Sequence, residues 1–272
     1  MPFSHFTCSR TYTRGTRFLF SAVAAAVLLS AGCASEVRAK RFTELLQLYP
    51  ETQSPLKVRP LPDAALARDP SPRTVTIIVH PAYALFFRNE KRNTYSEAKY
   101  DLLEYQLFQE TRYIRDAAKK GDIIILVIPG GYELDSIAPP SYTTYLNSMA
   151  GEGQAVYFIR SETTHSGIIA LDTTVKLHGF LRSIRTSKIL IGGGFVGRCQ
   201  GEFYRQFTTY VENVPTFIVP EISTLSPDDI SSGDAEDILT GIRNKDYQLI
   251  VDFIGNKGEE PNILGMPPTG SH

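Results

Sequence analysis

Hydrophobic residues occur along this chain in two patterns, short uninterrupted runs and longer stretches with helical spacing. The short runs are aliphatic or β-branched almost throughout, and they occupy residues 74–79, 122–128, 154–159, 188–191 and 216–219. Runs of this length and composition predict strands that are buried on both faces of a sheet. A further run at residues 247–251 predicts a sixth strand.

The stretches between these runs have the spacing of amphipathic helices. Within residues 96–119, for example, Leu103, Leu107, Ile114 and Ala117 follow the helical period. Other helices are predicted at residues 141–150, 172–185, 197–212 and 234–243. Apolar strands that alternate with helices favour a parallel sheet covered on both faces. We therefore expect one doubly wound α/β domain over residues 73–255, with a mostly parallel sheet of five or six strands.

The first 32 residues have the pattern of an export signal. Three arginines and no acidic residue accompany an apolar run at residues 18–29, which is too short to span a bilayer. The run ends in Leu29-Ser30-Ala31-Gly32-Cys33, which resembles the lipobox of bacterial lipoproteins. This resemblance implies that residues 1–32 are removed and that Cys33 is lipidated. The alternative is an uncleaved anchor helix in which Cys33 has no role.

The lipobox also implies a location. With Ala34 instead of Asp after the lipidated cysteine, the resemblance implies the outer membrane of a Gram-negative cell, with the domain facing the periplasm. More than one acyl chain makes such an anchor stable. Residues 33–72 would form the tether, because six prolines between residues 50 and 73 favour an extended spacer. A short helix is predicted within it at residues 36–48, and residues 256–272 are expected to form a flexible tail.

Composition and charge narrow the range of partners. Over 272 residues, 28 Lys and Arg stand against 29 Asp and Glu, so nothing indicates a nucleic-acid partner. Removal of residues 1–32 would shift the net charge from −1 to −4 and leave Cys199 as the free thiol, so no intramolecular disulfide is expected. No cluster of His and Cys has metal-ligand spacing. We expect neither a metal nor a cofactor, and a membrane contact only through Cys33.

Polar residues follow directly after several predicted strands, where parallel sheets bind their ligands. His80 follows the first strand, Arg160 follows the third, and Cys199 lies at the start of the helix after the fourth. A thiol at a helix N-terminus is expected to have a lowered pKa, and His80 would serve as its base. The alternative is a buried cysteine, because Cys199, Phe203 and Phe207 share one helix face.

Two stretches of the domain resemble the isochorismatase-like cysteine hydrolases. Residues 76–87 (TIIVHPAYALFF) are similar to the opening strand and turn of that family, and residues 193–199 to its nucleophile turn. The family triad is an aspartate base, a lysine and a cysteine nucleophile, and the matching positions here hold His80, Arg160 and Cys199. The resemblance implies attack of the thiolate on a small amide or ester, with the amides of the glycine turn holding the oxyanion.

The glycines before Cys199 support a different hypothesis. Gly192, Gly194 and Gly197 form a G-x-G-x-x-G pattern between a predicted strand and a predicted helix, which resembles the Rossmann dinucleotide fingerprint. Such glycines let a pyrophosphate approach a helix N-terminus, and Glu221 would bind the ribose. The alternative is a tight turn that needs glycine for its dihedral angles.

The sequence thus leaves three functions open. The first is a degenerate cysteine hydrolase whose His80, Arg160 and Cys199 gather at one edge of the sheet. The second is a non-catalytic envelope lipoprotein that binds a small molecule or another envelope protein. The third is a nucleotide-binding domain that uses the glycine pattern.

Overall fold

The computed structural model describes residues 41–63, 72–87, 95–151, 153–211, 213–257 and 261–265. The predicted export signal and Cys33 lie outside these residues, and so does part of the predicted tail. Within the described part of the chain, no helix combines the length and the hydropathy that crossing a membrane requires.

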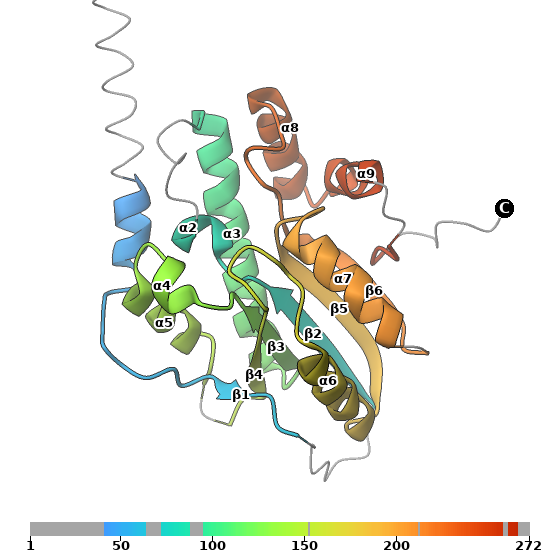
Figure 1. The fold of residues 1–272 in the computed structure, drawn as a ribbon. Coiled ribbons are helices and arrows are strands. Elements are labelled where there is room, and N and C mark those ends of the chain that lie inside the picture. Colours follow the sequence, from blue (N-terminus) through green and yellow to red (C-terminus); the bar gives the residue numbers. More distant parts are fainter. Residues whose placement is uncertain are drawn as a thin grey trace, which may run out of the picture.

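The described residues contain a six-stranded sheet in which all neighbouring strands are parallel, in the order β1-β4-β3-β2-β5-β6 (Figure 1). The strands are β1 (Arg59–Pro60), β2 (Arg73–Val79), β3 (Ile123–Ile128), β4 (Val156–Arg160), β5 (Thr186–Gly194) and β6 (Thr216–Thr224). All five strands predicted between residues 74 and 219 are present. The predicted doubly wound α/β fold with five or six strands is therefore confirmed.

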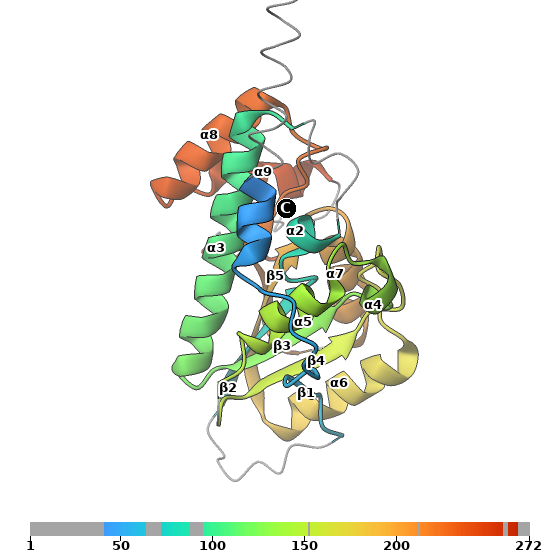
Figure 2. The ribbon, with the colours of Figure 1, turned by 90° about the vertical axis from the view of Figure 1, so that its left-hand side faces the viewer.

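Helices cover both faces of this sheet (Figures 1 and 2). One face carries α2 (Tyr83–Phe86), α3 (Glu97–Lys119), α4 (Tyr132–Asp135) and α5 (Pro139–Asn147). The other face carries α6 (Leu171–Ser183) and α7 (Cys199–Tyr210), and α8 (Ser232–Arg243) and α9 (Gln248–Asn256) pack beside α3 and β6. Side chains of each strand alternate between the two layers, so that Ile78 faces α3 while Ile77 and Val79 face α6 and α7.

The predicted strand at residues 247–251 is wrong, because most of this run belongs to α9. Ile250 and Ile254 are buried four residues apart, whereas Leu249 remains 46% exposed. A short apolar run fits either the strand or the helix period, and here the helical spacing continues beyond the run. The sixth strand is instead β1, which pairs with β4 through Arg59 opposite Tyr157.

Residues 41–63, which the sequence assigns to the tether, pack against the α/β domain (Figure 2). Residues 41–47 are helical, inside the predicted range of 36–48, and residues 48–58 form neither helix nor strand. Phe42, Tyr49 and Val58 are each less than 7% exposed. The buried apolar side chains of this segment attach it to the domain, so residues 41–63 are not a free spacer.

Candidate functional site

The strand order reverses between β2 and β5. From β2 the chain continues to β3 and β4 on one side, and from β5 it continues to β6 on the other side. Open α/β sheets bind ligands in the crevice at the carboxyl ends of the strands where the order reverses. In this protein His80 directly follows β2, and Gly194 is the last residue of β5.

His80 is fully buried at this edge and contacts the loop after β4. Its Nε2 lies 3.0 Å from Oγ of Ser161. The Ser161 hydroxyl donates to the carbonyl of Thr163 at 2.7 Å and accepts the backbone N–H of Gly130 at 3.1 Å. Because the hydroxyl proton is used on Thr163, Nε2 of His80 carries the ring proton and donates it to Ser161. Nδ1 of His80 then offers a lone pair, and it has no hydrogen-bond partner among the described residues.

The surroundings of His80 keep its ring neutral. The ring stacks on Tyr83 with centroids 5.3 Å apart, and the Tyr83 hydroxyl lies 2.6 Å from Nδ1 of His165. Burial lowers the pKa of His80 to about 3, and the nearby His165 shifts it in the same direction. His80 also has a positive φ of 47°. Such backbone strain in a residue other than glycine is concentrated at functional sites.

Cys199 opens α7 as predicted, but its thiol is not activated. The side chain is 5% exposed, and Sγ donates to the backbone carbonyl of His165 at 3.3 Å. Burial raises the pKa of the thiol to about 11, and the carboxylate of Glu202 adds to this shift. The expected lowering of this pKa is therefore wrong. The favourable charge of Arg198 is outweighed by burial, and its guanidinium is paired with Asp229 at 2.8 Å.

The buried-cysteine alternative describes the structure better. Cys199, Phe203 and Phe207 belong to one core cluster on the α6 and α7 face of the sheet. The thiol therefore packs as a small apolar side chain. No hydrogen bond joins His80 to this thiol: Nε2 contacts Ser161, Nδ1 has no hydrogen-bond partner among the described residues, and the thiol donates to the carbonyl of His165.

Arg160 ends β4 and faces the surface. Two of its guanidinium nitrogens bond the two carboxylate oxygens of Glu133, at 2.7 and 3.2 Å, and the guanidinium lies over the ring of Tyr132. The Arg160 side chain is 40% exposed. This arginine is thus used in a surface ion pair, and the structure does not bring it together with His80 and Cys199 as one catalytic group.

The glycines of the predicted fingerprint lie mainly within β5. Its last three residues, Gly192–Gly194, are still part of the strand. A Cβ on Gly192 would lie 2.5 Å from the Ile222 side chain, and one on Gly193 would lie 1.9 Å from the carbonyl oxygen of Val79. Glycine is needed here for close packing between neighbouring strands. The space that a pyrophosphate would need is filled by protein.

The other residues of the nucleotide hypothesis have similar roles. A Cβ on Gly194 would lie 3.1 Å from Cβ of Thr224. Gly197 lies in the turn before α7 with a φ of 68°, and the Lys257 side chain covers it. The Glu221 carboxylate accepts a hydrogen bond from the side chain of Gln109 on α3. This arrangement favours the alternative in which the glycines serve the backbone.

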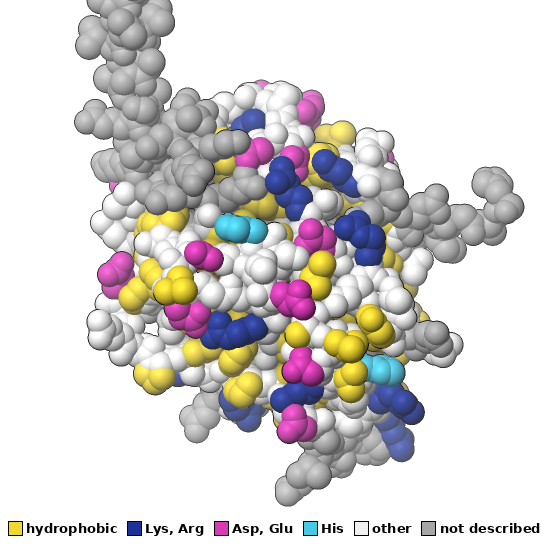
Figure 3. Space-filling view, in the orientation of Figure 1, with side chains coloured by type: hydrophobic (Ala, Val, Ile, Leu, Met, Phe, Trp, Pro, Cys, Tyr) yellow, Lys and Arg dark blue, Asp and Glu magenta, His cyan; other side chains and the backbone are white. Residues whose placement is uncertain are grey.

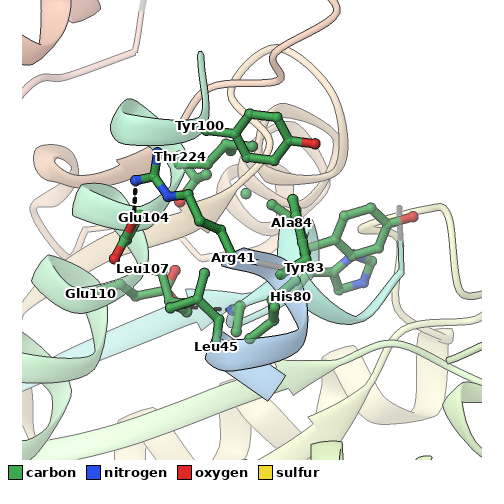
Figure 4. A pocket seen from close by; sticks show the side chains of 15 residues that line it. Arg41, Leu45, His80, Tyr83, Ala84, Tyr100, Glu104, Leu107, Glu110 and Thr224 are labelled. Atoms are coloured by element: carbon green, nitrogen blue, oxygen red, sulfur yellow. Dashed lines mark hydrogen bonds and ion pairs between the residues drawn. The ribbon is translucent and has the colours of Figure 1, made fainter. Parts of the chain in front are cut away.

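A small cavity lies beside His80 on the α3 face of the sheet (Figure 4). Its free volume is about 30 Å³, enough for one or two water molecules. The domain lines it with His80, Tyr83, Tyr100, Leu107, Glu110 and Thr224. Cys199 does not line it, so the cavity and the thiol are separate features of this edge.

Glu110 is the second buried ionisable group of this cavity. Its Oε1 accepts the backbone N–H of Ala82 at 2.9 Å and the hydroxyl of Tyr145 at 3.3 Å. Burial raises the pKa of Glu110 to about 8, although these two hydrogen bonds act in the opposite direction. The carboxyl thus keeps its proton at neutral pH. Glu110 is not among the residues predicted for the site, although it continues the apolar stripe of Leu103 and Leu107 at helical spacing.

Comparison with known proteins gives a likeness of fold. No protein-family model matches the sequence, and no curated protein matches it. A nicotinamidase from Staphylococcus aureus is 14% identical over 72% of this chain and 100% of its own, with a TM-score of 0.38. An isochorismatase from Pseudomonas putida is 17% identical over 66% and 90%, with a TM-score of 0.40. A cysteine hydrolase from Pseudomonas syringae is 15% identical over 76% and 100%, with a TM-score of 0.33. The chemistry of this chain has to be judged from its own residues.

Proposed function

We propose that this protein is an envelope lipoprotein that binds a small molecule at the carboxyl edge of its sheet, without using a catalytic thiol. The observation that carries the proposal is the presence of two fully buried ionisable side chains, His80 and Glu110, in the wall of one cavity. Burying such groups in neutral form costs stability. Strongly shifted pKa values in a cavity at this place in an α/β sheet are typical of functional sites.

The cysteine-hydrolase hypothesis receives less support from the same residues. A thiolate nucleophile needs a lowered pKa or an adjacent base. Cys199 has a raised pKa, and its hydrogen-bond partner is the carbonyl of His165, which cannot take up its proton. Arg160 is engaged by Glu133. We therefore favour the non-catalytic function among the hypotheses that the sequence leaves open.

The face of the molecule shown in Figure 3 favours a small molecule over a protein as the partner. On the face shown in Figure 3, acidic and basic side chains are interspersed, and hydrophobic side chains lie in small groups. Protein-binding surfaces usually present larger continuous apolar areas. The cavity beside His80, in contrast, combines apolar walls with a few polar atoms, as binding sites for small molecules do.

The binding function can be tested with two variants. We would screen small uncharged compounds by ligand-observed NMR against the wild type, His80→Gln and Cys199→Ser. We expect compounds that bind the wild type to bind Cys199→Ser equally and His80→Gln at least several-fold more weakly. Hydrolysis of p-nitrophenyl acetate measured on the same three proteins should not depend on Cys199. Ester hydrolysis that disappears in Cys199→Ser would contradict the proposal and support the hydrolase hypothesis.

The lipid anchor is tested separately. The lipobox predicts acylation of Cys33 and an outer-membrane location facing the periplasm. Cells that express the chain would be grown with an alkyne-tagged palmitate, and membranes would be separated by density. We expect label on the wild type in the outer-membrane fraction and none on Cys33→Ala. Equal labelling of the two proteins, or an unlabelled wild type, would rule out the anchor.

A further inference from the structure

One wall of the cavity beside His80 is formed by a segment that lies outside the sheet and its covering helices. Residues 41–47 are helical, and they are called the lid helix below. Its residues Arg41, Phe42 and Leu45 line the cavity from the side opposite the domain. Figure 4 shows Arg41 and Leu45 on the same cavity as His80 and Glu110.

The lid helix is held to α3 by a charged clamp. The Arg41 guanidinium pairs with the carboxylates of Glu97 at 2.5 Å, Asp101 at 2.8 Å and Glu104. These three residues lie in the first turns of α3. Glu97 is 60% exposed and Asp101 is 39% exposed, and neither lines the cavity. The clamp is therefore partly in water, where ion pairs stabilise only weakly.

Phe42 contributes an aromatic ring to the wall of the cavity. Its side chain is 3% exposed, and its ring meets Tyr100 edge-on, with centroids 5.3 Å apart. Aromatic pairs of this geometry are favourable beyond their buried area. With Phe42 in place, the remaining free volume of about 30 Å³ is too small for another ring.

The polar atoms of the cavity indicate an uncharged ligand with a hydroxyl group. His80 is neutral and Glu110 is protonated at neutral pH, so the interior offers no counter-charge to an ion. The charged residues of the lining, Arg41 and Glu104, are paired with each other. His80 lines the cavity and its Nδ1 lone pair has no hydrogen-bond partner among the described residues, so a ligand hydroxyl would supply the missing donor.

We propose that this cavity binds a small uncharged molecule that carries a hydroxyl group on an aromatic ring, and that the lid helix is displaced when it binds. The ring would replace Phe42 beside Tyr100, and the hydroxyl would donate to Nδ1 of His80. This inference rests on the proposed function, because it names the ligand class and the gate of the same site.

Displacement of the lid has a measurable consequence for affinity. If only a small fraction of molecules has the lid open, the apparent dissociation constant equals the intrinsic one divided by that fraction. Loosening the clamp from outside the cavity should therefore tighten binding. The double variant Glu97→Gln/Asp101→Asn does this, because both residues are clamp partners of Arg41 and neither touches the cavity.

The test uses phenol as the probe and the full-length chain at pH 7. Dissociation constants from ligand-observed NMR would be compared for the wild type, the clamp variant and Glu236→Gln/Asp237→Asn, which makes the same charge change on exposed positions of α8. We expect the constant for phenol to fall roughly 3- to 10-fold in the clamp variant and to stay unchanged in the control. Phenol should also speed up amide hydrogen exchange within residues 41–47, while exchange in α7 reports that the fold is intact.

The outcomes separate this inference from the function on which it rests. Equal phenol affinity in the wild type and the clamp variant, with unchanged exchange at residues 41–47, would overturn the lid while leaving the binding site in place. Phenol binding that survives His80→Gln would place the probe elsewhere and overturn the assigned contact. Absence of phenol binding in all variants would overturn the ligand class, and the broader screen of uncharged compounds would then decide whether the cavity binds anything.

Discussion

Nε2 of His80 lies 3.0 Å from Oγ of Ser161, and this contact joins the end of β2 to the loop that follows β4. The sequence predicts the same imidazole as a base for Cys199. Its ring proton is donated to Ser161, while the Cys199 thiol donates to a backbone carbonyl. The loop after β4 therefore receives a polar contact from each of the two residues, and no hydrogen bond joins the imidazole to the thiol.

The first prediction concerns the reactivity of Cys199. Burial raises its thiol pKa from an ordinary 9.0 to about 11, which leaves about 100-fold less thiolate at pH 7. We expect iodoacetamide to modify Cys199 at least about 100-fold more slowly in the native protein than in urea. Mass spectrometry of the digested protein would follow this site separately from Cys8 and Cys33. Rapid native modification below pH 7 would show an activated thiol and contradict the buried arrangement.

The second prediction concerns acid stability and His80. Burial lowers the pKa of His80 from 6.5 to about 3, so between these values the unfolded chain binds a proton that the native protein does not. Stability is therefore lost as the pH falls through this window, by about 1.4 kcal/mol per pH unit for this one group. In His80→Gln the slope between pH 6 and 4 should be shallower by that amount, as measured by urea unfolding. His178→Gln removes a partly exposed imidazole from α6 and serves as the control. An equal change in the pH slope of the unfolding free energy in His178→Gln would refute the prediction.

The third prediction concerns Glu110 and has the opposite sign. Burial raises the pKa of Glu110 from 4.5 to about 8, so the native protein keeps a proton that the unfolded chain has released. Stability is lost as the pH rises through this window. Glu110→Gln should therefore become more stable relative to the wild type from pH 5 to 8, by about 1.4 kcal/mol per pH unit, and the difference should level off above pH 8.

A matched control for this carboxyl is Glu133→Gln. Burial disfavours the charged form of Glu133, but the hydrogen bond from Arg160, a backbone hydrogen bond and the charge of Arg160 together outweigh burial and lower its pKa. Its protonation therefore changes below the window of Glu110, and urea unfolding of Glu133→Gln should follow the pH dependence of the wild type from pH 5 to 8. A flat difference curve for Glu110→Gln over the same range would mean that its carboxyl is ionised in the native protein.

The fourth prediction concerns the glycine pattern. A Cβ on Gly193 would lie 1.9 Å from the carbonyl oxygen of Val79, at a φ of 93°. Gly121 has a similar φ of 84° but nothing within 4 Å of its Cβ position. We expect Gly121→Ala to cost about 1 kcal/mol of unfolding free energy and Gly193→Ala roughly 3 kcal/mol or more. Urea unfolding of both variants measures the difference, and similar costs would mean that β2 and β5 are not closely packed at this point.

Most of the fold could be predicted from local sequence, because the central strands are uninterrupted apolar runs. Strand β1 could not be predicted, since Arg59 and Pro60 have no strand pattern. They form a strand only because β4 offers an unpaired edge. The run at residues 247–251 misled the prediction because five residues fit both periods, and the burial of Ile250 and Ile254 becomes clear only with the tertiary packing.

The candidate site was predicted less completely. The placement of His80 at the carboxyl edge follows from the strand pattern, and the burial of Cys199 is anticipated by its helical spacing from Phe203. Glu110 could have been recognised as a charged residue on an apolar helix stripe. The clamp of Arg41 could not have been recognised from the sequence, because its partner Glu104 lies 63 residues away along the chain.

The path of residues 41–63 determines which contacts would break first if the chain were pulled from its N-terminal side. The lid helix precedes β1 along the chain, and the contacts of Arg41 and Phe42 hold it to α3. Directly after β1, the backbone N–H of Leu61 donates a hydrogen bond to the carbonyl of Phe158 on β4. A force that pulls the chain from its N-terminal side therefore acts on the lid helix first. The same force acts on β1 only after the lid helix has detached from the domain. Tension on the proposed lipid anchor at Cys33 would thus displace Phe42 from the cavity while the strands of the sheet stay paired.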